Sequence, residues 1–348
     1  MRYFFACICC ISLLSCSLKE PLYHNQSYVF GTLVDISTYG ETDAEGQNIT
    51  ATILREFQNL HNRLHAWKPS ELNGINHQIA QGNSARVAPD IADMLKQSTQ
   101  YSVQSGGLFN PAIGELIQTW GFQNDEFHAL SIDTKKIATL VKANPQMTDL
   151  IIEDNHITSK NRHVQLDLGG YAKGYALDVG MTMLKNQGVK NALINIGGNV
   201  IALGKHGEHP WRVGIQHPRK PNAIAALNLE SGWAIGTSGD YQRYFMLDGK
   251  RYCHIIDPRT GIPAQGTQSV TVLIPPQANA GVLSDVTSKP IFISEPNKKQ
   301  EAIKRMNVKD VMIIQENGDI LITPSMLKRI EWLEPDAKTH LQILQSLS

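Results

Sequence analysis

The chain has 348 residues with 32 basic and 32 acidic side chains, so its formal net charge is zero. This balance argues against a protein that holds a polyanion such as nucleic acid, which would need an excess or a stripe of basic residues. The hydrophobic fraction of 42% is too high for a disordered chain, and polar residues interrupt it too often for several membrane spans. The length suits one large or two ordinary domains with a buried core.

The cysteines are concentrated at the N-terminus, where four of the five lie: Cys7, Cys9, Cys10 and Cys16. A basic residue followed by an apolar run over residues 3–14 is typical of a secretory signal, and the run is too short to span a bilayer comfortably. The segment Leu-Leu-Ser-Cys16 is similar to a bacterial lipobox, whose cysteine becomes lipidated. We therefore predict a signal peptide over residues 1–15, lipidation of Cys16 and a polar tether over residues 16–27. Cleavage near Cys16 without lipidation, or a retained anchor, is the alternative.

These features predict an exported bacterial lipoprotein that is anchored to a membrane and faces the periplasm. Acyl chains on Cys16 would hold it on the membrane surface. We favour the inner membrane, but Ser17 lacks the Asp that often signals retention there, which leaves the outer membrane open. The mature chain would keep one unlipidated thiol, Cys253, so we expect no internal disulfide.

The remaining sequence predicts a mixed α+β protein. Loose alternation predicts a first strand over residues 28–36, and apolar spacing predicts helices over 48–64, 89–104 and 176–187. A helix and a short hairpin are expected within residues 123–161. Strands are predicted over 192–196, 211–216, 225–229, 234–237, 244–247 and 269–274. A helix from residue 282 is disturbed by Pro290, and a hairpin over 311–322 closes the chain. Because helices dominate first and strands later, a strict βαβ array is excluded.

Two glycine-containing segments could approach a ligand through their backbone. The segment Ser105-Gly-Gly-Leu-Phe-Asn-Pro111 is either a ligand-binding loop or a turn between helices. The segment Asp167-Leu-Gly-Gly-Tyr-Ala-Lys-Gly-Tyr175 lies where a strand meets a helix, so its N–H groups and Lys173 could receive an anion. The alternative there is a glycine cap with a surface lysine. The sequence has no Walker A motif and no GxGxxG after the first strand.

Two further segments carry polar side chains suited to catalysis. Between Arg251 and Gly261, His254 could act as a base if a neighbour orients it, although a lone histidine is more often structural. Asp285 and Ser288 share a helix face, and such oxygen ligands suit Mg²⁺; a helix N-cap is the equal alternative.

Six segments in this order resemble the ApbE family. They are the run from Ser105 to Phe122, Asp167-Leu-Gly-Gly-Tyr-Ala-Lys-Gly-Tyr-Ala-Leu-Asp178, Asn195-Ile-Gly-Gly-Asn199, Pro210-Trp-Arg-Val-Gly-Ile215, Thr237-Ser-Gly-Asp-Tyr-Gln-Arg-Tyr-Phe245 and His254-Ile-Ile-Asp-Pro-Arg-Thr-Gly261. The resemblance covers about residues 28–325. It implies one catalytic unit over residues 28–348, which could divide into two subdomains, with antiparallel-rich sheets and flanking helices.

The resemblance also implies a reaction. Members of this family are FAD:protein FMN transferases, typically exported bacterial lipoproteins, which join FMN from FAD through phosphate to a Thr hydroxyl of a partner and release AMP. His254 matches the base, and Asp285 and the Gly170 carbonyl match Mg²⁺ ligands. The positions that match contacts to FAD are Phe30, Trp67, Leu108, Phe109, Asn110, Asp167, Lys173 and Ile256. The implied partner is an acceptor protein with a motif of the type Asp-x-Ser/Thr-Gly/Ala-Thr, such as a membrane redox-complex subunit.

The chain departs from the family pattern at several of these positions. The turn that follows Trp67 is one residue shorter than usual, Phe30 replaces a usual Met, and Asn110 stands where Asp is common. Lys289 stands where many members have a Thr that binds the metal. Either Ser288 supplies a hydroxyl instead, or the charge of Lys289 partly replaces a metal contact.

Three other hypotheses compete with FMN transfer to a protein. The same site could act as a periplasmic FAD pyrophosphatase that gives FMN and AMP, because water and a Thr hydroxyl attack the same phosphorus. A flavin-binding lipoprotein without catalysis is a second alternative, but a pure binder needs no base such as His254. A nucleophilic Cys253 is the third, and many relatives carry Ser at that position.

Overall fold

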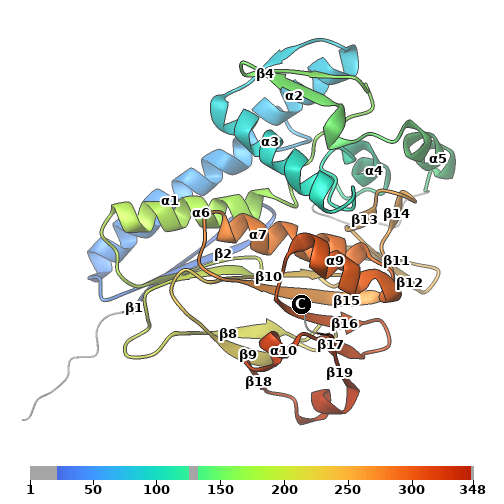
Figure 1. The fold of residues 1–348 in the computed structure, drawn as a ribbon. Helices are drawn as coiled ribbons and strands as arrows, with labels where there is room; N and C mark the ends of the chain where they lie inside the picture. The colour runs from blue at the N-terminus through green and yellow to red at the C-terminus, as the bar shows by residue number, and fades with distance from the viewer. Residues whose placement is uncertain (1–21, 125–131, 346–348) are drawn as a thin grey trace, which may run out of the picture.

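The protein is built around one large antiparallel sheet (Figure 1). The structure, a computed structural model, describes residues 22–124 and 132–345. The sheet has nine strands, and only the pair β17–β19 is parallel. In spatial order the strands are β1 (Leu22–Val29), β2 (Thr32–Tyr39), β6 (Ala192–Ile196), β7 (Asn199–Leu203), β10 (Ala234–Gly239), β15 (Thr267–Ile274), β16 (Asp310–Gln315), β17 (Ile320–Ile322) and β19 (Leu341–Ile343). The mixed α+β class with antiparallel-rich sheets is confirmed.

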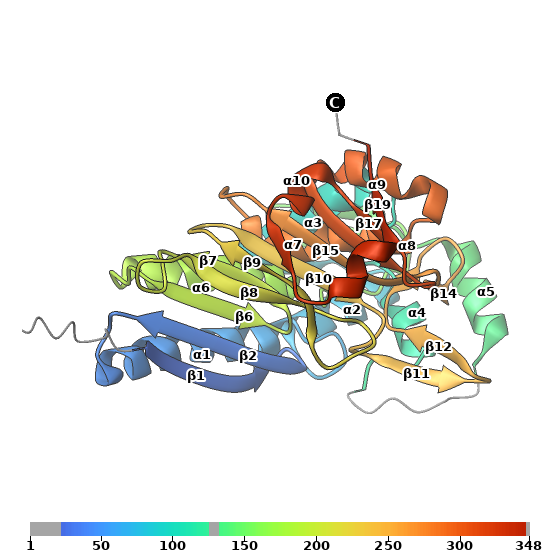
Figure 2. The same ribbon diagram turned by 90° about the horizontal axis from the view of Figure 1, so that it is seen from below.

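Each face of this sheet is covered by a different kind of layer. Helices cover one face: α1 (Asp43–Arg63), α6 (Ala172–Asn186), α7 (Ala280–Val286), α8 (Ser288–Ile293) and α9 (Lys299–Met306). A small sheet and a short helix cover the other: β8 (Trp211–Gln216), β9 (Ala223–Leu229), β18 (Ile330–Trp332) and α10 (Pro324–Leu327). Seen from below, β8 and β9 lie in front of the large sheet (Figure 2).

A further group of elements lies above the helical layer in Figure 1. It contains α2 (Glu71–Gln81), α3 (Pro89–Gln104), α4 (Gly114–Thr119), α5 (Thr134–Ala143) and the sheet of β3 (Ala85–Arg86), β5 (His156–Ser159) and β4 (Leu150–Glu153). Beside it lie the hairpins β11 (Tyr244–Leu247) with β12 (Lys250–Cys253) and β13 (Ile256–Asp257) with β14 (Ile262–Pro263). Short 3₁₀ helices occupy Met147–Asp149, Pro296–Lys298 and Pro335–His340. One continuous hydrophobic core connects α2 and α3 with the helical face of the large sheet, whereas α4 and α5 pack with the β11–β12 hairpin in a separate core.

Several predicted elements have the predicted bounds, namely α3, β6, β8 and β11. The predicted single strand over residues 28–36 is wrong, because Phe30 and Gly31 form a tight turn with φ of 57° and 70° between β1 and β2. The predicted tether is wrong for residues 22–27, which form most of β1. Side chains of this edge strand alternate between exposed and half-buried, so its polar composition looks like that of a tether. Residues 1–21, with Cys16, lie outside the described residues.

Helix boundaries differ from prediction where capping decides them. Helix α1 begins five residues early, because Thr42 and Glu45 form a capping box. The helix predicted from residue 282 is two helices that meet at Thr287. Pro290 lies in the first turn of α8. The N–H groups of a first turn have no acceptor within the helix, so a proline there removes no helical hydrogen bond and does not end the helix. Among the described residues, no helix combines the length and hydropathy of a membrane span.

Helices α6 and α7 touch through glycine and cap each other. A Cβ on Gly281 would lie 2.5 Å from the carbonyl oxygen of Gly174, so only glycine permits this approach. The carboxylate of Asp178 in α6 accepts the N–H groups of Gly281 and Val282 at 2.8 and 2.9 Å. In return, the carboxylate of Asp285 in α7 accepts the Gly174 N–H at 3.1 Å. This contact fixes Asp285 relative to the N-terminus of α6.

Gly281→Ala is expected to lower the free energy of unfolding by about 1–3 kcal/mol, because the added methyl group forces two backbones apart. The matched control is Gly74→Ala in α2, where a Cβ meets nothing within 4 Å. That change should raise the free energy of unfolding by about 0.5–1 kcal/mol, since alanine favours helix over glycine. Urea unfolding of both variants measures the difference. Equal stability of Gly281→Ala and the wild type would contradict the tight contact.

Candidate functional site

A cavity of about 500 Å³ lies where the loops that follow α1 and α3 meet the β1–β2 turn and the end of β10. Its volume falls in the usual range for small-molecule sites. Loops and element ends from the whole chain line it, including the β1–β2 turn, the end of α1, the start of α6 and the β12–β13 link. Eleven predicted site residues line it: Phe30, Trp67, Leu108, Phe109, Asn110, Asp167, Gly170, Lys173, His254, Ile256 and Asp285. Of the predicted site residues within the described chain, Ser288 is the one that does not.

One wall of the cavity is aromatic. The ring of Phe30 lies edge-on to that of His61, with centroids 5.7 Å apart, and His61 lies 5.4 Å from His65. The Nδ1 atom of His65 accepts the N–H groups of Trp67 and Lys68, each at 3.1 Å. These two bonds assign the proton of a neutral His65 to Nε2. The wall offers planar surfaces against which a ring system could stack.

The loop after α3 is both a turn and a part of the cavity wall. Gly106 and Gly107 have φ of 68° and 81°, and the Ser105 hydroxyl accepts the Phe109 N–H at 3.0 Å. Asn110 is buried, and both ends of its amide are bound by the fold. Its Nδ2 donates to the Pro145 carbonyl at 2.8 Å, and its Oδ1 accepts the Ala112 N–H at 3.1 Å.

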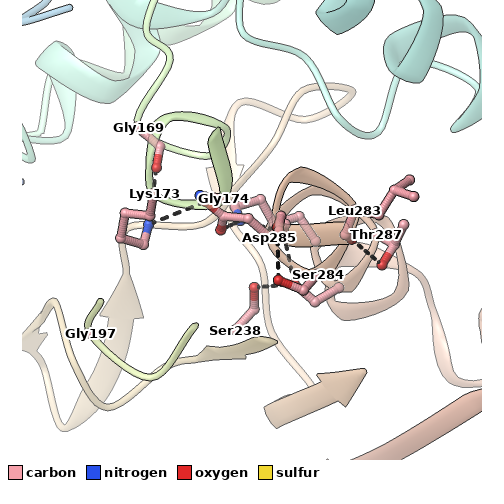
Figure 3. A network of polar contacts seen from close by, with 12 residues as sticks. Gly169, Lys173, Gly174, Gly197, Ser238, Leu283, Ser284, Asp285 and Thr287 are labelled. Atoms are coloured by element: carbon pink, nitrogen blue, oxygen red, sulfur yellow. Dashed lines mark hydrogen bonds and ion pairs between the residues drawn. The ribbon is translucent and has the colours of Figure 1, made fainter. Parts of the chain in front are cut away.

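The start of α6 forms a second, charged wall. Lys173 donates to the Gly169 carbonyl at 3.1 Å and lies 3.7 Å from Oδ2 of Asp285 (Figure 3). Asp167 accepts the Gly169 N–H at 2.7 Å, and burial raises the pKa of this carboxyl. A helix N-terminus with an adjacent ammonium favours an anion in the cavity.

Asp285 is held between two lysines. Its Oδ1 lies 2.6 Å from the ammonium of Lys289, while Oδ2 faces Lys173 and the Gly174 N–H. Burial alone would raise the pKa of Asp285, but the two ammonium groups outweigh it and hold the pKa below its usual value. The carboxylate therefore stays ionised at neutral pH.

The predicted magnesium ligands do not fit a metal ion as they stand. Each oxygen of the Asp285 carboxylate already contacts an ammonium or an N–H group. The Ser288 hydroxyl is buried behind the cavity, where it donates to the Asp285 carbonyl at 3.0 Å and lies 2.8 Å from the Ser238 hydroxyl. The described residues contain no group of three or more His, Cys, Asp or Glu side chains that could hold a metal.

His254 has the geometry of an oriented neutral base. Its Nδ1 lies 3.2 Å from the Arg243 carbonyl oxygen, which also accepts the His254 backbone N–H at 3.0 Å. A carbonyl only accepts, so Nδ1 carries the proton and Nε2 keeps its lone pair. Burial, together with the charges of Arg243, Lys173 and Lys289, lowers the pKa of His254 to about 3. The imidazole is therefore neutral at physiological pH.

The other polar residues of the His254 segment support the fold. Asp257 and Arg259 form an ion pair at 2.8 Å that closes the β13–β14 turn. Cys253 is buried, its thiol faces the carbonyls of Ile255 and Ala264, and burial raises its pKa to about 12. Such a thiol forms almost no thiolate at neutral pH, which argues against a nucleophilic cysteine.

The sequence profile of the ApbE family matches residues 30–313 of this chain. The chain belongs to the ApbE family. A relative named FAD:protein FMN transferase from Rhodobacter capsulatus is 39% identical over 307 residues, covering 88% of this chain and 58% of the relative's own length. A protein of the same name from Escherichia coli K12 is 31% identical over 262 residues, covering 73% and 71% of the two chains.

Solved structures of the ApbE family share the fold. The crystal structure of the ApbE protein from Thermotoga maritima superposes with a TM-score of 0.80 at 28% identity, covering 89% of this chain and 99% of that one. The flavin transferase ApbE from Vibrio cholerae gives a TM-score of 0.76 at 24% identity, over 89% and 99% of the two chains.

Some residues of the ApbE site were not singled out from the sequence. They include His61, in the last turn of α1, and His65, which lies two residues beyond that helix; their spacing of four residues is the available signal. Arg243 also lines the cavity, and its carbonyl orients His254. A backbone contact of this kind leaves no pattern in the sequence.

We expect ¹⁵N NMR of histidine-labelled protein to show His254 neutral, with its proton on Nδ1, from pH 8 down to pH 5. An ordinary histidine titrates near pH 6.5, whereas the lowered pKa of His254 keeps its base form at lower pH. Comparison with His254→Gln assigns the signal. A protonated His254 at pH 6 would contradict the assigned environment.

Proposed function

We propose that this chain transfers FMN from FAD to a Thr hydroxyl of a target protein, forming a phosphoester bond and releasing AMP. Membership of the ApbE family supports this activity, since the relatives are named FAD:protein FMN transferases. The observation that carries it is His254, an oriented neutral base at a cavity that also holds cationic side chains. Phosphoryl transfer depends on such positioning and charge neutralisation.

The proposed reaction assigns a task to each wall of the cavity. The aromatic wall of Phe30, His61 and Trp67 suits the isoalloxazine ring, while the N-terminus of α6 and Lys173 suit the pyrophosphate. Nε2 of His254 takes the proton of the acceptor hydroxyl as its oxygen attacks the phosphorus of the FMN half. The bond to the bridging oxygen breaks, and AMP leaves with that oxygen.

The resemblance also implies Mg²⁺ as a cofactor. Because the side chains of Asp285 and Ser288 are engaged as described above, no step of the mechanism is assigned to a metal ion. The Mg²⁺ requirement stays a prediction from the sequence.

The acceptor and the place of action are also part of this proposal. We infer that the protein is an exported lipoprotein, anchored through acyl chains on Cys16 to the periplasmic face of a membrane. We favour the inner membrane over the outer one. A membrane redox-complex subunit with a flavinylation Thr would be within reach of such an enzyme. The support is the N-terminal sequence pattern and the transferase family.

His254→Ala is expected to reduce FMN labelling of an acceptor domain by about 10³-fold, because general-base catalysis of this kind contributes 10²–10⁴-fold. In-gel flavin fluorescence on the acceptor measures transfer, and fluorescence titration measures FAD binding, which should persist. Full labelling by the variant would overturn the role of His254.

The matched control is His163→Ala, an exposed histidine that lies away from the cavity and should leave labelling unchanged. FMN and AMP released by the wild type with an unlabelled acceptor would instead identify a FAD pyrophosphatase.

Cys16→Ser is expected to abolish incorporation of radiolabelled palmitate and to move the protein from the membrane to the soluble fraction. Acyl chains supply the hydrophobic energy of anchoring, so loss of the attachment thiol removes it. Cys253→Ser is the control and should keep both the label and the location. Unchanged labelling of Cys16→Ser would contradict lipidation at this residue.

A further inference from the structure

Lys289 lies against two of the residues predicted to bind magnesium, Asp285 and Gly170. Its ammonium donates to Oδ1 of Asp285 at 2.6 Å and to the Asp285 carbonyl at 2.7 Å. Its aliphatic part packs on Gly170, where an added Cβ would lie 2.9 Å from Cε of the lysine. The side chain thus occupies the space between two residues that the family resemblance assigns to a metal.

The packing around Lys289 keeps it in this place. Residue 289 follows Asp285 by four positions, across the junction of α7 and α8, and its side chain is only 16% exposed. The α6–α7 glycine contact fixes the backbone that carries Asp285, and the Gly174 N–H holds its carboxylate, so the partner of the ammonium is held in place. Gly170 leaves room for the lysine, whose side chain would have to shift if residue 170 carried a Cβ.

The charges of this corner differ from those of a metal site. Asp285 contributes one negative charge, while Lys173 and Lys289 contribute two positive ones, so the three groups keep a net charge of +1. A divalent cation would have to displace one ammonium from Asp285 and then lie beside two like charges. A pyrophosphate has the opposite sign, so it is attracted by the cluster as it stands.

We propose that the ammonium of Lys289 takes the place of the divalent cation, so that this enzyme binds the pyrophosphate of FAD and transfers FMN without a metal. The inference rests on the proposed function. In the step, the bond from the Thr oxygen to the phosphorus of the FMN half forms, and the bond to the bridging oxygen breaks. The hydroxyl proton goes to Nε2 of His254 and then to solvent, and AMP leaves with its two charges. Lys289 keeps its proton and balances the phosphate charge throughout.

The first test compares transfer to an acceptor domain with Mg²⁺ and with excess EDTA. The wild type should label the acceptor at the same rate, within about twofold, in both conditions. Lys289→Thr should lose about 10²-fold in EDTA, since removal of one preorganised donor to the transition state costs 10²–10³-fold, and Mg²⁺ should restore most of this loss. Lys298→Thr, at an exposed lysine just before α9, is the matched control and should behave as the wild type.

A second variant separates charge from packing. Lys289→Met keeps the aliphatic contact with Gly170 but cannot donate, so it should be folded by circular dichroism and slow in both conditions. A Lys289→Met enzyme as fast as the wild type would overturn the proposal. So would a wild type that loses labelling in EDTA and regains it with Mg²⁺.

A measurement without turnover keeps the inference separate from the proposed function. Electron paramagnetic resonance of Mn²⁺ titrated into the protein with FAD should show no bound ion for the wild type and one for Lys289→Thr. If the wild type labels no acceptor in either condition, the transferase proposal fails. The Mn²⁺ titration then still decides the inference, and a bound ion in the wild type would overturn it.

Discussion

The contact between α6 and α7 is the constraint on which the site depends. Two glycines let the helix backbones touch, and each helix caps the other through a carboxylate, Asp178 in one direction and Asp285 in the other. The N–H groups at a helix start are costly to leave unpaired in a protein interior, so this exchange satisfies both helices at once. It also brings Asp285, the start of α6 with Lys173, and the start of α8 to the same corner of the cavity.

Local patterns in the sequence predicted much of the fold. Helix α3 and the strands β6, β8 and β11 have the predicted bounds, since their apolar spacing is set by burial on one side. Residues 22–27 of β1 have the polar composition of a tether because an edge strand needs little apolar surface, and the strand depends on pairing with β2. Backbone geometry decides the turn at Phe30 and Gly31, and a capping box decides where α1 begins. Neither feature changes the spacing of apolar residues, so a hydrophobic pattern does not reveal them.

The candidate site was predicted better than its internal contacts. Eleven of the predicted residues line one cavity although they come from distant parts of the chain, which reflects the family resemblance rather than spacing alone. The tasks of particular atoms could not be read from the sequence. The sequence places Ser288 on the same helix face as Asp285, but Ser288 begins α8 whereas Asp285 lies in α7. Its hydroxyl donates to the Asp285 carbonyl and lies beside the Ser238 hydroxyl in β10. The proton on Nδ1 of His254 is set by a backbone carbonyl that any residue at position 243 would present.

The zero net charge of the chain is compatible with an anion site because the charge is arranged locally. Arg243, Lys173 and Lys289 all lower the pKa of His254, which places three cations near one imidazole. A base in such surroundings stays neutral until an anion enters, and the entering negative charge raises its pKa toward the range in which proton transfer is efficient. In the proposed reaction, arrival of the pyrophosphate would therefore make His254 a stronger base. A cavity without these cations would hold a more basic histidine before binding and would gain less from the arrival of a phosphate.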